Sequence, residues 1–197
     1  MNKERYMTIT NILSNFQKHI DLTQGEKEHF TSFLIRRQLH KKEIILQQGE
    51  ACNYLNFVDS GILRAYYLGK DGKESTVMFA VSDWWITAMP CFIREIPAMV
   101  NIEAVEKSCI LQLSKTNLDQ LYRDIPKFER FFRILMQNAY IREQLRIIQN
   151  LSQTAEERYY NFLTKYPQIT PHLTQKQIAS YLGITPEFLS MIRRKKG

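Results

Sequence analysis

The side chains best suited to chemistry lie near the C-terminus, in the segment LTQKQIASYLGITPEFLSMIRRKKG, residues 173–197. Its lysines and arginines can neutralise phosphate groups, which would position the chain on a nucleic acid without reading its sequence. The carboxylate of Glu187 can accept a hydrogen bond from a cytosine amino group, so Glu187 is the best candidate for reading a base. This segment therefore indicates phosphate binding combined with base recognition.

The apolar residues of the segment have the spacing of a helix-turn-helix. The pattern begins at Gln175, and its structural positions are filled by Ile178, Ala179, Leu182, Gly183, Ile184, Leu189 and Ile192. Small Ala179 allows the two helices to cross closely, and Gly183 permits a left-handed turn between them. Thr174 and Thr185 can cap the two helices, and Pro186 suits the first position of the second helix. An ordinary helical hairpin is the alternative interpretation.

A helix-turn-helix places the N-terminal part of its second helix in the major groove of DNA. Ser190 would share the reading face with Glu187, and Met191 could touch a thymine methyl group. The residues expected to contact double-stranded DNA are Thr174, Gln175, Lys176, Thr185, Glu187, Ser190, Met191, Arg193 and Arg194, with Lys195 and Lys196 as further phosphate contacts.

The distribution of charge agrees with this assignment. The chain has a net charge of +7. Residues 1–120 carry 14 basic and 14 acidic side chains, whereas residues 121–197 carry 13 basic and 6 acidic ones. The excess in the C-terminal part fits a surface that binds a polyanion, although a solvated basic surface would have the same composition.

The elements that precede this segment begin with two helices and continue as short strands. A first helix is expected over residues 9–20 and a second one after the cap Thr23. From residue 37 onward, apolar and polar residues alternate in short runs, which are divided by turn signals at residues 48–50, 59–61 and 71–72. A further strand pair is expected within residues 99–114. These runs predict antiparallel hairpins closed into a small barrel or roll.

The stretch from Ile45 to Glu74 contains an Ile-x-x-Gln-Gly-Glu turn, a hydrophobic strand, a Ser-Gly bend and an Asp-Gly-Lys-Glu hairpin. It resembles the cyclic-nucleotide-binding roll of the catabolite activator/Fnr (Crp/Fnr) superfamily of bacterial regulators. Together with the C-terminal motif, the resemblance covers nearly the whole chain. It implies a homodimeric, DNA-binding transcription regulator, with RNA polymerase as a further partner. The alternative is that any hairpin-rich roll needs glycine at similar places.

The chain departs from the family at the positions that would hold a cyclic nucleotide. Members that bind one carry a Gly-Asp-x-x-Gly-Glu segment and, about ten residues later, an arginine for the phosphate. Residues 82–87 and 98–100 of this chain supply neither the glutamate nor the arginine. A buried phosphate without its cation would lose a strong charge-assisted contact, so we expect no tight binding of cyclic AMP.

Other departures concern the DNA-binding part and the cofactor. Family members often carry arginine where this chain has Pro186 and Met191, which predicts a different sequence preference. Many relatives continue into a two-stranded wing, so a wing here would have to precede the motif or be absent. The clustered N-terminal cysteines of iron-sulfur members have no counterpart before Cys52. No cofactor is expected.

Two adjacent tryptophans in the roll have two interpretations. Neighbouring strand residues point to opposite faces, so Trp84 and Trp85 can both serve as core packing. The alternative is a hydrophobic effector pocket lined by Tyr66, Met78, Trp84 and Trp85. The effector itself cannot be named from the sequence.

A long helix without glycine is expected over residues 125–153. Its apolar residues follow the alternating spacing of three and four that is typical of a coiled-coil seam. The predicted dimer contacts are Phe131, Ile134, Asn138, Ile141, Leu145 and Ile148. Asn138 can pair with its own copy across a two-fold axis, which favours a parallel dimer in register. Phe128, Phe132 and Leu135 widen the apolar face at the start, so this end should dock on the roll. In the alternative, the whole stripe packs on the chain's own roll.

The predicted fold is α+β. It comprises an N-terminal antiparallel roll of the cyclic-nucleotide-binding type over residues 1–120, a dimerisation helix over 121–153 and a helix-turn-helix domain over 154–197. The last of these begins with a helix capped by Thr154 that ends near Lys165. The leading hypothesis is a DNA-binding regulator, and the alternative is a metabolite-sensing or protein-interaction module that does not bind DNA.

Several classes of protein and site are not expected. The three cysteines, Cys52, Cys91 and Cys109, are too widely spaced for a disulfide framework or a metal motif, and the four histidines are scattered. No nucleophile and base pair suggests an enzyme, so no catalytic residue and no metal ligand is assigned. No apolar run is long enough to span a membrane, and the N-terminus lacks a secretory pattern, so a cytoplasmic location is expected.

Overall fold

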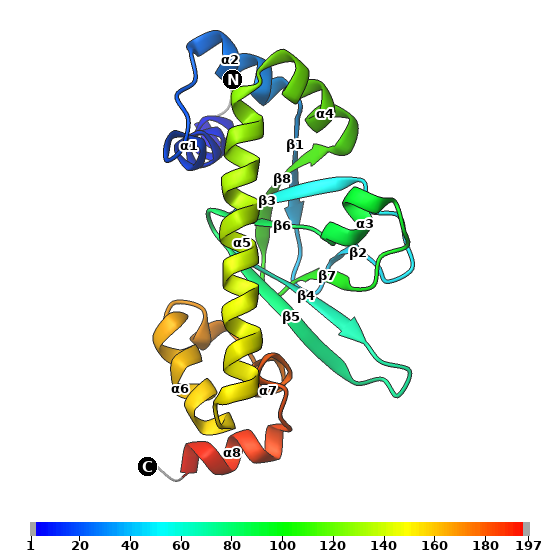
Figure 1. The fold of residues 1–197 in the computed structure, drawn as a ribbon, viewed down its shortest axis with the longest axis vertical. Coiled ribbons are helices and arrows are strands. Elements are labelled where there is room, and N and C mark those ends of the chain that lie inside the picture. The colour runs from blue at the N-terminus through cyan, green and yellow to red at the C-terminus, as the bar shows by residue number, and fades with distance from the viewer. Residues whose placement is uncertain (1–2, 195–197) are drawn as a thin grey trace.

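The computed structural model describes residues 3–194, with the side chains of residues 9–194. Its centre is a roll of two four-stranded antiparallel sheets (Figure 1). The strand order is β1-β8-β3-β6 in one sheet and β2-β7-β4-β5 in the other. The strands are β1 (Leu34–Leu39), β2 (Ile44–Leu46), β3 (Tyr54–Ser60), β4 (Ile62–Leu68), β5 (Glu74–Val81), β6 (Trp84–Ile86), β7 (Asn101–Ala104) and β8 (Ser108–Ser114). The predicted antiparallel roll is confirmed.

The turns between the strands fall at the predicted glycines. Gly61 separates β3 from β4 with a φ of 88°, and a Cβ there would lie only 2.7 Å from the Cα of Ser108. No other residue fits this close approach without a shift of β8. Gly72 has a φ of 76° in the turn that joins β4 to β5. These two strands form a long hairpin that projects from the roll (Figure 1).

Five helices surround the roll: α1 (Lys3–Gln17), α2 (Gln24–Ser32), α3 (Met89–Arg94), α4 (Lys115–Asp124) and the long α5 (Lys127–Ser152). Thr23 caps α2 through a reciprocal pair of hydrogen bonds with Glu26, as expected. Phe16 of α1 packs edge-on against Phe128 and Phe131 of α5, with ring centroids 4.9 Å and 4.3 Å apart. This aromatic cluster holds the start of α5 against the roll.

The C-terminal part consists of α6 (Ala155–Lys165), the 3₁₀ helix η1 (Thr170–His172), α7 (Gln175–Leu182) and α8 (Pro186–Arg194). Between residues 153 and 194 the structure contains no strand, so the described residues that precede the motif form no wing. A second hydrophobic core joins these helices to the roll, because Ile62, Phe79 and Val105 pack with Phe162 and Leu182. The predicted division at residues 120 and 153 stays a prediction.

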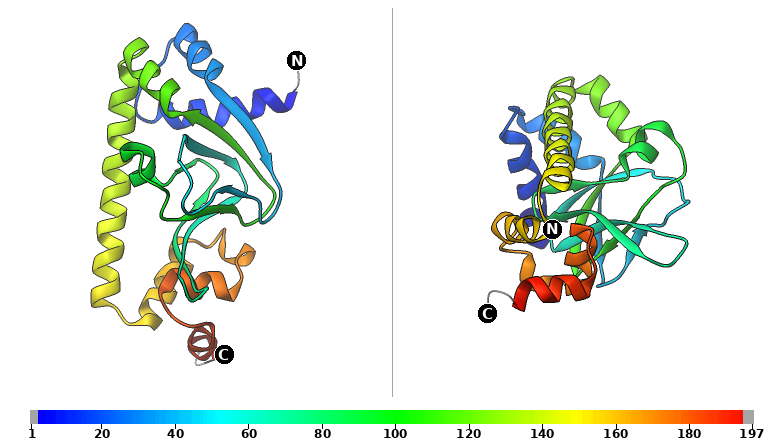
Figure 2. Two further views of the ribbon diagram at one scale, coloured as in Figure 1. Left: turned by 90° about the vertical axis from the view of Figure 1, so that its right-hand side faces the viewer. Right: turned by 60° about the horizontal axis from the view of Figure 1, so that its bottom comes forward.

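Figures 1 and 2 show the overall arrangement. The helix α5 runs along one side of the roll, from the N-terminal helices at one end to α6 and α7 at the other. The helix α8 lies at the end of the molecule, beyond α7, with no element outside it.

Candidate nucleic-acid interface and effector pocket

The helix-turn-helix has the local geometry that its sequence predicts. The Thr174 hydroxyl accepts a hydrogen bond from the Gln177 amide at 3.2 Å, and the Gln177 side chain accepts one from the Thr174 amide at 2.9 Å. Gly183 has a φ of 70° at the end of α7. The Thr185 hydroxyl accepts from the Phe188 amide at 3.2 Å, which caps α8. Both helices therefore start where expected, and α7 ends at the expected glycine.

The residues assigned to the interior of the motif are inside. Ala179 and Leu189 are fully buried, and Ile178, Leu182 and Ile192 are nearly so. Ile184 is partly buried and packs against the same core. Buried side chains at these positions set the crossing of α7 and α8, so the second helix has one face free.

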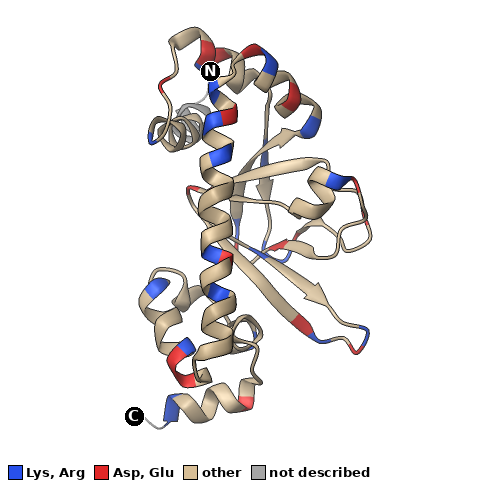
Figure 3. Ribbon diagram, viewed as in Figure 1, with Lys and Arg blue, Asp and Glu red and all other residues tan. Residues whose placement is uncertain are grey.

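The free face of α8 carries the predicted reading residues. Glu187 and Met191 are exposed, and Ser190 is half-buried beside Arg194, whose guanidinium donates to the Ser190 hydroxyl at 3.4 Å. Figure 3 shows the acidic start and the basic end of this helix at the tip of the molecule. Arg193 is exposed beside Arg194, whereas Lys195 and Lys196 lie outside the described residues. Phe188, 43% exposed on the same helix, was not predicted.

The helix α7 is docked on β5, which the sequence did not reveal. The Ser180 hydroxyl accepts from the Thr76 amide at 2.8 Å and donates to the Glu74 carbonyl at 2.9 Å. Lys176, a predicted phosphate contact, forms an ion pair with Glu74 at 3.2 Å. The predicted contacts Thr174 and Gln175 at the start of α7 are exposed.

Glu74 belongs to a largely buried charge cluster formed by residues of β4, β5 and β7. The nearly buried guanidinium of Arg64 contacts Glu74 and Glu103, each at 2.6 Å. Burial alone would raise the pKa of Glu74, but the hydrogen bond and charge of Arg64, together with Lys176, hold it below its usual value. Glu74 of β5 therefore links the charge cluster of the roll to Lys176 of α7.

A cavity of about 550 Å³ lies between the roll and α5. Met78, Trp84 and Trp85 line it, as the sequence suggested, with Leu135 and Met136 contributed by α5. Tyr66 does not line this cavity, so that assignment is wrong. Its neighbour Ala65 faces the cavity instead, because successive side chains of β4 point to opposite faces.

The tryptophans also serve as core packing. Trp85 is buried, and its indole nitrogen donates to the Asn15 side chain at 3.0 Å. Trp84 is half-buried and packs edge-on against Tyr166 of the C-terminal part, with ring centroids 6.4 Å apart. Core packing is thus confirmed for both tryptophans, and the effector pocket stays a prediction.

The charged residues around the cavity do not provide a free cation for a cyclic phosphate. Only Asp83, Arg142 and Glu143 carry charge among its described lining residues. Asp83 is paired with Lys18, and Arg142 contacts Glu143 at 3.3 Å. Of the two segments that depart from the family pattern, residues 82–87 lie beside the cavity and Met99 and Val100 lie at its edge.

The predicted dimer seam is partly exposed on α5. Ile141, Leu145 and Ile148 are each about half exposed, Asn138 is exposed and Ile134 is half-buried. Phe131 is wrong as a seam residue because it is 1% exposed within the aromatic cluster. Three further apolar residues on the outward side were not predicted: Tyr140, Ile147 and Leu151.

Over the described residues, no group of three or more histidine, cysteine, aspartate or glutamate side chains is arranged to hold a metal ion. Nor does any described helix have the length and apolar character needed to cross a membrane.

Comparisons with known proteins agree with this geometry. Residues 36–124 match the family model described as a cyclic nucleotide-binding domain. The Anaerobic regulatory protein of Pasteurella multocida is 23% identical over 183 residues, a match that covers 87% of this chain and 66% of that protein. The Fumarate and nitrate reduction regulatory protein of Vibrio cholerae is 24% identical over 183 residues, with 87% and 72% covered.

The chain therefore spans from 66% to 72% of the length of these two relatives. Among solved structures, a crp/fnr family protein from Eubacterium rectale has a similar fold, with a TM-score of 0.72 and 24% sequence identity. That match covers 89% of this chain and 83% of the other.

Proposed function

We propose that this chain, which belongs to the Crp/Fnr family of bacterial regulators, controls transcription by binding DNA as a homodimer. The observation that carries the proposal is the helix α8, whose structural residues are buried while Glu187, Met191 and two arginines face outward at the tip of the molecule. This is the orientation a recognition helix needs to enter the major groove.

A homodimer is supported by the outward face of α5. Ile141, Leu145 and Ile148 lie one or two turns apart on this helix, and each is more than half exposed. An apolar stripe of this kind is costly in water and matches the seam of a parallel coiled coil. Pairing along α5 would present two copies of α8 to successive major grooves, about 34 Å apart.

Electrophoretic mobility shift of genomic DNA fragments tests DNA binding directly. We expect a subset of fragments to shift at nanomolar protein in the presence of excess competitor DNA. If no fragment shifts in preference to competitor, the chain acts instead as a sensing or interaction module.

For the roll we propose an apolar effector and no tight binding of cyclic AMP. The cavity between the roll and α5 is lined mostly by apolar side chains, and the charges at its border are already paired. Calorimetric titration with cyclic AMP should show no micromolar binding; a Kd of that order would contradict the assignment.

Location and further partners follow from the regulatory role. A DNA-binding regulator of a bacterium works in the cytoplasm, and RNA polymerase is the partner through which such a regulator would act. No catalytic function is assigned to the chain.

A further inference from the structure

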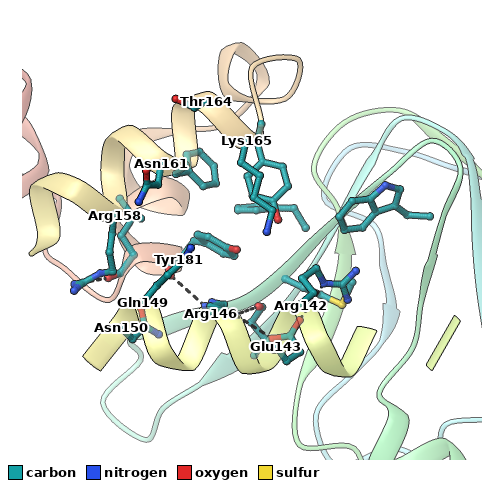
Figure 4. Close-up of a pocket in the computed structure, with 17 residues that line it drawn as sticks. Arg142, Glu143, Arg146, Gln149, Asn150, Arg158, Asn161, Thr164, Lys165 and Tyr181 are labelled. Atoms are coloured by element: carbon teal, nitrogen blue, oxygen red, sulfur yellow. Dashed lines mark hydrogen bonds and ion pairs between the residues drawn. The ribbon is translucent and has the colours of Figure 1, made fainter. Parts of the chain in front are cut away.

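A second cavity, of about 300 Å³, lies where α5, α6 and α7 meet β5. Figure 4 shows it between Arg142 and Arg146 of α5 and Lys165 of α6, with Tyr181 of α7 beside them. We call it the junction pocket, because it touches both the roll and the C-terminal helices. It adjoins the cavity of the roll, and Trp84 and Arg142 line both.

The junction pocket is strongly cationic. Four basic side chains line it: Arg142, Arg146, Arg158 and Lys165. The carboxylate of Glu143 is the sole acidic group among its described lining residues, and it is shared between Arg142 at 3.3 Å and Arg146 at 3.9 Å. Within the described chain, no carboxylate lies within ion-pair distance of Arg158 or Lys165. The pocket therefore holds more positive charge than its own carboxylate balances.

Neutral groups orient two of these cations. Arg146 donates to the carbonyls of Thr76 and Tyr181, at 3.0 Å and 3.2 Å, and also to that of Val77. Arg158 donates to the carbonyls of Gln153 and Leu182, at 2.8 Å and 3.2 Å. Carbonyls hold a guanidinium in place without cancelling its charge, so both positive charges are preorganised.

One group in the pocket is poorly satisfied as the chain stands. The Nε atom of Arg158 is buried and has no hydrogen-bond partner within the described structure. A buried donor without an acceptor is costly for a protein, and an anion in the pocket would supply the acceptor.

We propose that the junction pocket binds a small phosphate monoester. Planar guanidiniums match the oxygens of a phosphate, and a dianion balances the surplus charge better than a single carboxylate does. The volume is at the lower end of ligand pockets, which limits the ligand to a small metabolite. The guanidinium of Arg142 lies 5.0 Å from the ring centre of Trp84, and that of Arg146 lies 4.3 Å from the ring centre of Tyr181. These two rings would form the sides of the binding site.

A bound phosphate would link α5 to α6 at the base of the C-terminal helices. It would thereby favour one orientation of α8 relative to the roll. A phosphate that favours one orientation of α8 would change the affinity for DNA, and this expectation rests on the proposed function. The binding of phosphate to the pocket does not depend on the proposed function.

Isothermal calorimetry on the full chain tests the site with four probes: inorganic phosphate, glucose 6-phosphate, adenosine monophosphate and uncharged adenosine. At least one of the three phosphates should bind with a Kd below 1 mM, and adenosine should not. Lys165→Gln and Arg158→Gln should each weaken that binding about tenfold or more, since each removes a positive charge that no carboxylate of the described chain pairs with. Lys165 is exposed at the surface, so its variant should fold.

The matched control is Arg133→Gln, which removes an exposed arginine of α5 outside the pocket and should leave the Kd unchanged. The proposal fails if no phosphate binds at 10 mM, or if the two pocket variants bind as the wild type does. It also fails if the pocket variants weaken DNA binding while no small phosphate binds, because the pocket would then be a contact for the DNA backbone. If neither the wild type nor any variant binds DNA, the proposed function is contradicted, whereas the calorimetric test of phosphate binding remains valid.

Discussion

Glu187 is the residue on which we expect sequence recognition to depend most. It is exposed in the first turn of α8, where a carboxylate can reach the amino group of a cytosine. We expect Glu187→Ala to change which DNA sequences are preferred, because it removes a base contact and leaves the phosphate contacts in place. Selection of binding sites from a random DNA pool, compared between wild type and variant, measures this.

Arg194→Ala is the matched control on the same helix. Arg194 is expected to bind a phosphate, so its loss should weaken binding to specific and random DNA equally and reduce the salt slope of the affinity by about 1. Equal losses for both variants on both kinds of DNA would show that Glu187 does not read a base.

Arg64 is the residue that matters most for the stability of the β4–β5 hairpin. Its side chain is 5% exposed and pairs with Glu74 and Glu103. We expect Arg64→Met to destabilise the chain by about 3–5 kcal/mol, because it leaves the largely buried carboxylate of Glu103 without a cation and that of Glu74 with only Lys176. Urea denaturation followed by circular dichroism measures the change.

Lys107→Met, at an exposed position near the same sheet, is the control and should have little effect. Adding Glu74→Gln to Arg64→Met should recover part of the loss. Since the folded pKa of Glu74 is lowered, its contribution is present above the unfolded pKa of about 4.5 and is lost as pH falls through the folded value. A loss below 1 kcal/mol in Arg64→Met would contradict this account.

At the scale of elements, the sequence predicted the turns and the helices α2, α5, α6, α7 and α8. It placed the first helix at residues 9–20, whereas α1 spans Lys3–Gln17, and it missed α3 and α4. The long helix was expected over residues 125–153 and spans Lys127–Ser152. The prediction succeeded because apolar residues spaced by three and four, with no glycine between them, favour a helix along the whole stretch. The caps Thr23, Thr154, Thr174 and Thr185 all fall where expected. Each threonine hydroxyl accepts a hydrogen bond from the backbone amide three residues later, which has no partner within its own helix.

The assignment of faces was less reliable. Phe131 fits the heptad spacing, yet it packs on Phe16 because α1 covers that end of α5, which spacing within one helix cannot reveal. Tyr66 lies on the opposite face of β4 from Ala65, where it is buried with the guanidinium of Arg64 over its ring at 4.2 Å. Which face of that strand lines the cavity could not be told from the sequence.

The contact between α7 and β5 gives an element-scale prediction. Ser180→Ala removes the hydroxyl that satisfies the Thr76 amide and the Glu74 carbonyl. We expect the C-terminal helices to detach from the hairpin more easily, by about 1 kcal/mol or about fivefold in the opening equilibrium. Hydrogen exchange should speed up in residues 74–78 and 175–182.

Ser152→Ala is the control, since its hydroxyl bonds only to the Ile148 carbonyl within α5. Unchanged exchange in both segments of Ser180→Ala would mean that the other contacts, such as Lys176 with Glu74, are enough to hold α7 in place.

On the scale of the whole molecule, the junction between the roll and the C-terminal helices could not be predicted. Its contacts join residues about 70 to 106 positions apart, such as Arg146 with Thr76 and Ser180 with Glu74. No local pattern encodes such pairs, and the sequence offered only a regional excess of basic residues. The junction pocket is visible only once these segments are brought together.

The proposed dimer also belongs to this scale. Leu145→Glu places a charge in the exposed apolar stripe of α5, so we expect the chain to become monomeric and to lose most of its DNA affinity. Light scattering coupled to size exclusion gives the mass directly. Ile93→Glu, an equally exposed apolar position on α3, should remain dimeric. If the wild type itself is monomeric at micromolar concentration, pairing through α5 is ruled out.

Hydroxyl-radical footprinting on a selected DNA fragment tests the central claim, that two copies of α8 read DNA together. The account predicts two protected patches whose centres are separated by one helical turn, about 10 base pairs, with protection lost for Leu145→Glu. A single patch, or no protection at concentrations where the protein shifts the fragment, would contradict it.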